Sequence, residues 1–166
     1  MKKLNNPWAK LPGYFCFGCA PDNKAGVRMK FFSDGNDVIS VWSPEQQFQG
    51  WIDTLHGGIQ SVLVDEICAW VVMLNYNTTG VTSKMEMRFM KPISTKEPYL
   101  IIRATVKEKR RNLVTVDATI TDTKGNTCAK GECLYFTFPP EHGMAENVPY
   151  EGEEITMDEI LSEYKK

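Results

Sequence analysis

The longest run of mainly apolar residues lies at 57–76, GGIQSVLVDEICAWVVMLNY, and it contains no proline. Its length favours a helix over a strand. At 100° per residue, one stripe of this helix carries large apolar side chains that we expect to face the core. The stripe consists of Ile59, Leu63, Ile67, Trp70 and Leu74.

The opposite face of this helix carries small or apolar side chains and one carboxylate. It consists of Ser61, Val62, Asp65, Cys68, Ala69 and Val72. A solvated face would be mostly polar, so we expect a partner subunit, a ligand or both to cover it. Asp65 is then a carboxylate in partly desolvated surroundings, which is typical of functional acids and bases. A structural hydrogen bond or ion pair at a subunit contact would explain it equally well.

Alternating apolar and polar positions predict strands on both sides of the helix. Before it, alternation at 27–31 is followed by a turn signal at 34–36 and a second extended stretch at 38–42. After it come four extended stretches, at 81–91, 99–106, 113–121 and 127–138. The breaks between the four are short and rich in turn residues, which predicts an antiparallel meander. The pattern therefore predicts an α+β domain in which a sheet of about six strands packs on one long helix.

The chain of 166 residues fits one domain at 1–140, opened by a lead-in segment at 1–25. Residues 141–166 form a tail with eight acidic and two basic side chains, a net charge of −6. The whole chain carries −2, so the rest carries +4, which favours an anionic ligand weakly. Within the tail, Thr156-Met157-Asp158-Glu159 predicts a capping box that opens a short, peripheral helix.

Several classes of protein are disfavoured by the sequence. The basic N-terminus is followed by no apolar run, so we expect no signal peptide, and no stretch suggests a membrane span. No basic motif indicates nucleic-acid binding. The five cysteines are an odd number, which favours free thiols in a reducing compartment. We therefore expect a cytoplasmic protein with neither a membrane nor a nucleic acid as its partner.

Cys16 and Cys19 have the spacing of half a zinc site. The sequence offers no second cysteine pair and no nearby histidine to complete four ligands. We therefore predict no metal, and we expect these two cysteines to pack around the lead-in segment.

The predicted helix begins at His56-Gly57-Gly58. Backbone N–H groups at a helix start lack partners within the helix and carry partial positive charge, so they can polarise a carbonyl oxygen. Gly57 and Gly58 lack side chains that would block a substrate, although two glycines also permit a tight entry into a helix. Nine residues separate His56 from Asp65, about 13 Å along a helix, so joint action on one substrate requires two subunits.

Around these residues the sequence resembles the hotdog-fold acyl-CoA thioesterases, in the branch related to the phenylacetate-pathway thioesterases. The resemblance covers about residues 14–138 and rests on CFGCAPDNKAGVRMKFF at 16–32, FQGWIDTLHGGIQSVLVDE at 48–66 and KMEMRFMKPI at 84–93. It implies a curved antiparallel sheet wrapped around the long helix. It also implies a homodimer or a dimer of dimers, with subunits joined edge to edge and an acyl-CoA entering at the interface. No cofactor is implied, because coenzyme A is part of the substrate.

The resemblance also implies roles for individual residues. An amide of Gly57 or Gly58 would polarise the thioester carbonyl, His56 would orient it, and Asp65 of the other subunit would be general base or nucleophile. The remaining candidates are substrate-binding. They are Gln49 in place of an asparagine ahead of the histidine, Thr82 or Ser83 to hold the attacking water, and Arg88, Lys91, Arg110 and Arg111 for the phosphates of coenzyme A.

Two other functions remain open. The hotdog fold also hosts hydratases and dehydratases that act on acyl thioesters. A chain that keeps the pocket and lacks catalysis would be an acyl-CoA-binding module. Met85, Met87 and Phe89 alternate along one strand face, where they either pack in the core or line an acyl chain.

Overall fold

A computed structural model of the protein describes residues 1–139 and 149–164. Residues 141–148 and 165–166 of the predicted tail, His142 among them, lie outside these ranges. The elements are β1 Lys2–Asn5, β2 Phe32–Asp34, β3 Asp37–Trp42, the 3-10 helix η1 Gln46–Phe48, β4 Gln49–Trp51, β5 Thr54–Leu55, α1 Gly57–Tyr76, β6 Gly80–Phe89, β7 Leu100–Arg110, β8 Leu113–Thr121, β9 Thr127–Thr137, β10 Tyr150–Glu154 and α2 Met157–Ser162.

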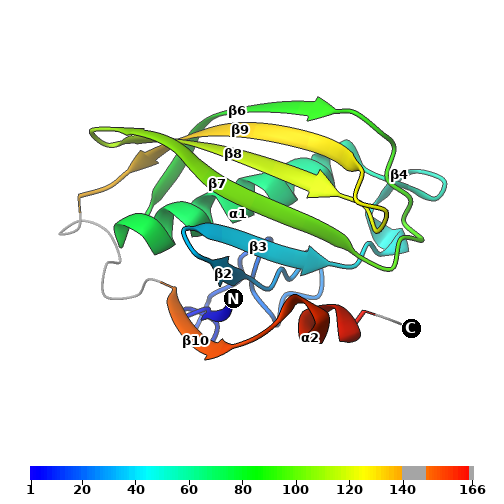
Figure 1. Cartoon of the computed structure of the whole chain (residues 1–166), viewed down its shortest axis with the longest axis horizontal. Coiled ribbons are helices and arrows are strands. Elements are labelled where there is room, and N and C mark those ends of the chain that lie inside the picture. Colours follow the sequence, from blue (N-terminus) through cyan, green and yellow to red (C-terminus); the bar gives the residue numbers. More distant parts are fainter. Residues whose placement is uncertain (140–148, 165–166) are drawn as a thin grey trace.

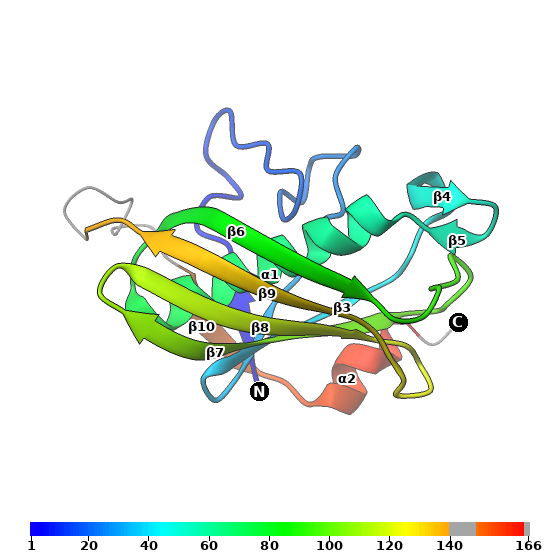
Figure 2. The ribbon, with the colours of Figure 1, turned by 90° about the horizontal axis from the view of Figure 1, so that it is seen from above.

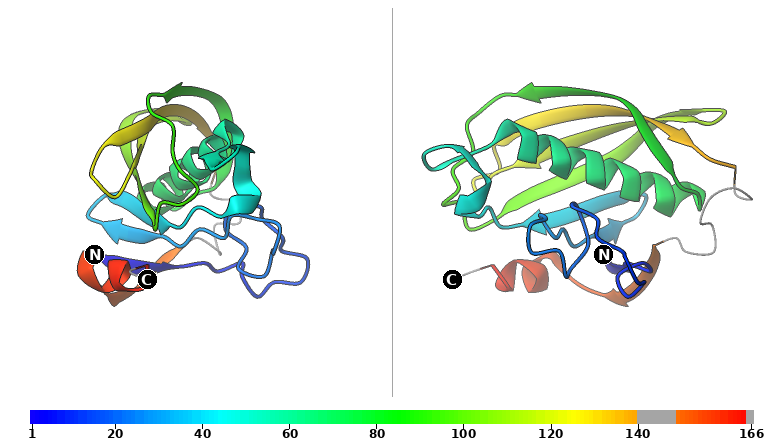
Figure 3. Two further views of the ribbon diagram at one scale, coloured as in Figure 1. Left: turned by 90° about the vertical axis from the view of Figure 1, so that its right-hand side faces the viewer. Right: turned by 180° about the vertical axis from the view of Figure 1, so that it is seen from behind.

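One curved antiparallel sheet of eight strands wraps around α1, in the order β10-β1-β2-β3-β7-β8-β9-β6 (Figure 1 and, end-on, Figure 3). The predicted α+β class and the wrapped helix are confirmed, and the sheet has eight strands where about six were predicted. The predicted meander is correct for β7, β8 and β9. It is wrong for β6, which pairs with β9 at the far edge of the sheet and not with its successor β7.

The core lies between the concave face of the sheet and α1. Alternate residues of β7 and β8 point into it and are fully buried, among them Leu100, Ile102, Val114 and Val116. Their neighbours in the sequence face outward, which is the alternation that a sheet with one covered face requires. α1 is long and apolar enough to cross a bilayer by composition, and here it is the core helix that this sheet encloses.

The bounds of α1 agree with the prediction, whereas its buried face is rotated. Cys68 and Val72, expected on the second face, are fully buried in the core, and Ile59 and Leu74 at the two ends are only partly buried. The helix is apolar on nearly every side, so its periodicity specifies no unique core face. The contacts with the sheet decide the orientation.

The lead-in segment covers the side of α1 that the sheet leaves open (Figure 2). Phe31 stacks on Trp70 with ring centroids 4.0 Å apart, and Trp8 meets the same indole edge-on at 6.4 Å. Trp70 was expected to face the sheet, and its packing against the lead-in segment corrects that. Aromatic pairs in these arrangements add to the stability that burial provides.

Residues 27–31 alternate in burial as predicted but do not form the first strand of the sheet. Val27 N–H donates to the carbonyl of Phe17 and Met29 N–H to that of Gly18, both at 2.8 Å. Between them Arg28 has φ 52°, outside the range of a strand. The backbone here therefore pairs with the lead-in segment, and β2 begins at Phe32.

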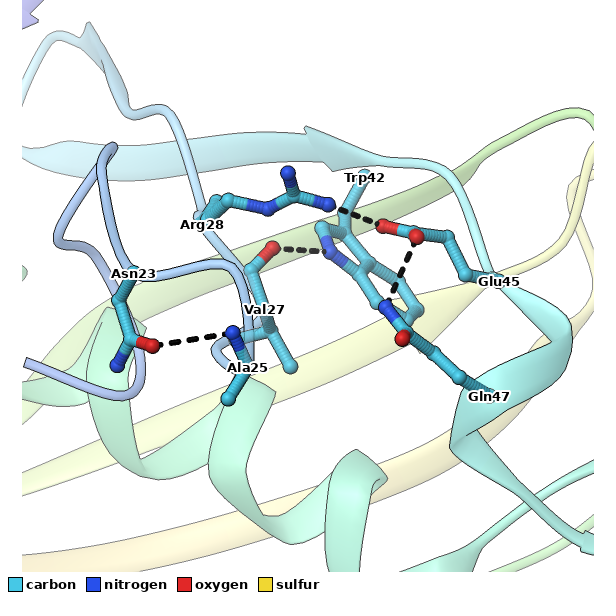
Figure 4. A network of polar contacts seen from close by, with 7 residues as sticks. All are labelled: Asn23, Ala25, Val27, Arg28, Trp42, Glu45 and Gln47. Atoms are coloured by element: carbon cyan, nitrogen blue, oxygen red, sulfur yellow. Dashed lines mark hydrogen bonds and ion pairs between the residues drawn. The ribbon is translucent and has the colours of Figure 1, made fainter.

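A polar network fixes this segment against β3 and η1 (Figure 4). Trp42 Nε1 donates to the carbonyl of Val27 at 2.7 Å, and Arg28 pairs with Glu45 at 2.7 Å. Gln47 donates to the other oxygen of Glu45 at 3.0 Å. The network holds the approach to β2 in place.

The predicted capping box is confirmed. The Thr156 hydroxyl accepts from the Glu159 amide, and the Glu159 carboxylate accepts from the Thr156 amide. Ile160 of α2 is 1% exposed and packs with Phe32 and Val41. The described part of the tail is therefore attached to the sheet by both β10 and α2.

Candidate active site

The start of α1 leaves one backbone N–H available. His56 is the N-cap, and its Nδ1 accepts a hydrogen bond from the Gly58 amide at 2.8 Å. The amides of Ile59 and Gln60 donate to the His56 carbonyl at 3.0 and 3.1 Å. Among residues 1–139 and 149–164, the Gly57 amide has no acceptor. Of the two glycine amides that the sequence proposed, Gly57 is thus the one free to meet a ligand.

The His56 ring is held in one orientation. Because Nδ1 accepts a hydrogen bond, the neutral ring carries its proton on Nε2, which can donate to a carbonyl oxygen. Gly50 lies against this ring, and a Cβ there would be 2.7 Å from His56 Cδ2. Gln49 is used elsewhere, since its Oε1 accepts from the Asp53 amide at 3.2 Å. It is not directed at the helix start.

Asp65 is half-buried, and its Oδ1 accepts a hydrogen bond from the Thr82 hydroxyl at 2.6 Å. Asp65 and Thr82, both candidates from the sequence, therefore meet within one chain. Thr82 precedes an irregularity in the pairing of β6 with β9, between Thr82 and Lys84, and the exposed Ser83 lies within it. The hydrogen bond distinguishes Thr82 from Ser83, which the sequence could not do.

The helix face around Asp65 is half-covered and apolar. Val62 and Ala69 beside it are partly buried, as are Met85 and Met87 of the adjacent β6. Phe89, at the end of β6, is 54% exposed, and its ring lies 3.5 Å from the position of a Cβ on Gly57. β6 pairs with β9 alone, so its other edge is open within the described chain. An apolar surface beside an open strand edge favours contact with another surface.

The predicted phosphate-binding residues are not gathered in one place. Arg88 lines a shallow hollow on the outer face of the sheet with Glu86 and Lys130, away from α1. Arg88 therefore points away from α1 of its own chain, because strand neighbours point to opposite faces of the sheet and Phe89 takes the inner one. Lys91 is exposed just beyond β6.

Arg110 and Arg111 lie at the tip between β7 and β8, beside the C-terminal end of α1. The preceding Lys109 places its ammonium 3.9 Å from the ring centroid of Tyr76, the last residue of α1. A helix of 20 residues is about 30 Å long, so this tip is remote from Gly57 of the same chain.

The sequence did not identify Glu66, which the fold brings beside Cys16 and Cys19. The three line one cavity of about 400 Å³, next to Trp8, Trp70 and Tyr135. Burial raises the pKa of Glu66 to about 7. A hydrogen bond from Cys19, aided by the Gly18 and Cys19 amides, lowers the pKa of Cys16.

The fold and the sequence can now be compared with known proteins. A long core helix wrapped by a curved antiparallel sheet is the hotdog fold, and residues 53–129 match the family model of the Thioesterase superfamily. The match includes the helix start, Asp65 and Thr82. The chain therefore has the hotdog fold, and its residues 53–129 are similar to the Thioesterase superfamily. No curated protein sequence matches the chain.

Solved structures agree with this fold. Zebrafish Thioesterase Superfamily Member 2 matches 78% of this chain and 90% of its own, at 24% identity and a TM-score of 0.64. A Streptococcus mutans protein bound to acetyl CoA matches 78% and 96%, at 19% identity and a TM-score of 0.63. Another thioesterase superfamily protein matches 71% of this chain at 20% identity and a TM-score of 0.65; the match spans 58% of that protein.

Proposed function

We propose that the protein is an acyl-CoA thioesterase that hydrolyses its substrate to a free acid and coenzyme A. The observation that carries the proposal is Asp65, a carboxylate on a half-covered apolar helix face, oriented by the Thr82 hydroxyl at 2.6 Å. The match of residues 53–129 to the Thioesterase superfamily supports the reaction class. The similar Streptococcus mutans structure, which holds acetyl CoA, supports a CoA ester as the ligand.

In the proposed reaction the thioester carbonyl oxygen accepts the Gly57 N–H, and His56 Nε2–H donates to the same side. Asp65 takes a proton from a water molecule whose oxygen attacks the carbonyl carbon. The carbon–sulfur bond then breaks, and the proton passes to the thiolate of coenzyme A. Donors aimed at the developing oxyanion are the largest contribution in such sites. Alternatively, Asp65 attacks directly and the resulting anhydride is hydrolysed.

The two halves of this site belong to different subunits in our proposal. Within one chain Gly57 and Asp65 are eight residues apart on one helix, about 12 Å along its axis. The open edge of β6 offers the contact (Figure 2). If two β6 strands pair antiparallel, the end of one, where Phe89 lies near Gly57, would lie beside the start of the other, where the Thr82 hydroxyl donates to Asp65. The resulting homodimer, alone or as a dimer of dimers, would hold two equivalent sites.

The same pairing of subunits would place the basic residues near the phosphates of coenzyme A. The tip with Arg110 and Arg111, at the far end of α1, would approach the helix start of the other subunit. There it would provide bidentate donors for phosphate groups. Lys91, beyond the end of β6, lies on the side of the helix start of its own chain.

Hydrolysis of a panel of CoA esters, from acetyl through long-chain to aromatic, tests the proposal by release of the free thiol. Asp65→Asn should remove most turnover while the protein stays folded. Asp117→Asn is a matched control, because Asp117 is half-exposed on β8 and contacts Lys107 at 3.7 Å. Equal turnover of the Asp65→Asn variant and the wild type would refute the proposed role.

Two outcomes would replace the proposal. Hydration of an enoyl-CoA in the absence of hydrolysis would make the protein a hydratase. Tight binding of CoA esters without turnover across the panel would make it a binding module. For an active protein, one turnover in ¹⁸O-labelled water separates the two roles of Asp65, since the label enters its carboxylate only if that carboxylate is the nucleophile.

A further inference from the structure

Three potential metal ligands from distant parts of the chain meet beside the lead-in segment. Cys16 Sγ lies 3.7 and 3.6 Å from the two carboxylate oxygens of Glu66. One ligand atom from each of Cys16, Cys19 and Glu66 lies within 4.8 Å of the other two. Ligands bound about 2.0 to 2.3 Å from a tetrahedral ion stand about 3.3 to 3.8 Å apart. The Cys16 and Glu66 atoms are therefore already at the spacing that a zinc site requires.

The surroundings of the two sulfurs resemble the outer shell of a thiolate site. The backbone amides of Gly18 and Cys19 help to lower the pKa of Cys16, so they favour its thiolate form. The Tyr14 hydroxyl lies 2.8 Å from Cys19 Sγ. Groups of this kind orient metal ligands and stabilise their negative charge.

The Glu66 carboxylate is built into the cysteine turn. A Cβ on Gly18 would lie 2.2 Å from Glu66 Oε2, so the carboxylate occupies the space that any larger residue would fill. Trp70 Nε1 donates to Glu66 Oε1 at 3.2 Å, and no basic side chain pairs with Glu66 in the described parts of the chain. An ionised carboxylate that is largely buried here is costly unless it takes up a proton or a cation neutralises it.

We propose that Cys16, Cys19 and Glu66 bind one zinc ion, which fastens the lead-in segment to α1. Two thiolates and one carboxylate favour zinc over magnesium or calcium, which prefer oxygen ligands alone. The thiol protons are released to solvent on binding. All three residues line the cavity of about 400 Å³, from which a water molecule would complete the tetrahedron. The expectation of no metal rested on the absence of a second cysteine pair and of a nearby histidine, and the fold brings a carboxylate to the two cysteines instead.

Metal binding to the full, reduced chain tests this site. Metal-free protein, prepared with a chelator and a reductant, is titrated with Co²⁺ and then with Zn²⁺. We expect one Co²⁺ per chain, with thiolate-to-cobalt charge-transfer bands and the visible bands of a tetrahedral ion, all removed by one equivalent of Zn²⁺. X-ray absorption of the zinc form should give two sulfur and two oxygen ligands.

Single-residue variants assign the ligands. Cys16→Ser and Cys19→Ser should each weaken Zn²⁺ binding at least a hundredfold, and Glu66→Gln at least tenfold. Cys128→Ser is the matched control, because Cys128 is a buried thiol on β9 that donates a hydrogen bond to the Asn126 carbonyl. This variant should bind Zn²⁺ as tightly as the wild type does. The X-ray absorption of the wild type remains decisive if a variant fails to fold.

Three results would overturn the zinc site. They are the absence of stoichiometric Co²⁺ or Zn²⁺ binding by the reduced wild type, a first shell without two sulfurs, and equal loss of binding in Cys128→Ser and Cys16→Ser. Activity of the protein on CoA esters does not enter these measurements. Failure of the proposed thioesterase function would leave them unchanged.

Discussion

Replacing Gly57 with proline removes one backbone N–H from the proposed site and leaves the helix intact. Gly57 is the first residue of α1, where proline is well tolerated because no N–H is needed within the helix. The preceding His56 has φ −61° and ψ 136°, the extended conformation that residues before proline prefer. A Cβ at this position would lie 3.5 Å from the Phe89 ring, an ordinary contact.

The size of the effect follows from the single free amide at this helix start. Loss of one oxyanion donor costs about 10² to 10³ in kcat, or about 2.7 to 4 kcal/mol. Gly57→Ala adds the same Cβ and keeps the N–H, so it controls for the added bulk. We expect kcat of Gly57→Pro to fall by about that factor relative to Gly57→Ala, with similar melting temperatures.

The assay is release of coenzyme A from the best ester of the panel, with circular dichroism to verify the helix. Equal kcat for the two Gly57 variants, both folded, would refute the role of this amide. Loss of helical signal in Gly57→Pro alone would show that the proline disturbs α1 itself.

Four other changes test separate parts of the account. Thr82→Val removes the hydroxyl that orients Asp65, so kcat should fall about tenfold to a hundredfold at unchanged KM. Thr82→Ser, which keeps the hydroxyl, should recover the activity. A change in KM alone would contradict a positioning role of Thr82. Gly18→Ala forces a methyl group against the Glu66 carboxylate and should lower the free energy of unfolding by about 1 to 3 kcal/mol in chemical denaturation; wild-type stability would contradict the packing. Thr156→Ala removes the cap of α2 and should speed hydrogen exchange of its amides roughly fivefold, whereas unchanged exchange would mean that the cap is dispensable. Burial raises the pKa of Glu66 from an ordinary 4.5 to about 7, so the folded metal-free protein binds this proton more tightly than the unfolded chain does. As the pH rises from about 4.5 to 7, the free energy of unfolding of the wild type should therefore fall relative to that of Glu66→Gln in chemical denaturation. Parallel pH profiles of the two proteins would contradict this prediction.

The helix and most strands follow from local patterns. The run at 57–76 coincides with α1, and the four later stretches agree with β6 to β9 within a few residues. The order of the strands in the sheet does not follow from local patterns, because periodicity shows which residues face the core and not which strands are neighbours. For this reason the position of β6 at the edge of the sheet was not predicted. The outward position of Arg88 could have been predicted from the sequence, because side chains alternate along a strand and Arg88 stands between Met87 and Phe89.

The sequence named residues of the candidate site but did not predict the contacts between them. Thr82 and Asp65 were both named, while their hydrogen bond depends on how β6 lies against α1. The Gly58 amide is occupied by His56 Nδ1, a local interaction that the spacing allows and does not require. Glu66 lies 50 residues from Cys16, so only the tertiary structure reveals the cluster.

The central claim is that one catalytic site combines Gly57 of one subunit with Asp65 of the other. Its most direct test is to mix two inactive variants, Asp65→Asn and Gly57→Pro, under conditions that exchange subunits. A heterodimer would carry one site with both changes and one with neither, so the mixture should regain about a quarter of the wild-type activity. A mixture that exchanges subunits, shown by mass spectrometry, and stays as inactive as its parents would contradict the shared site.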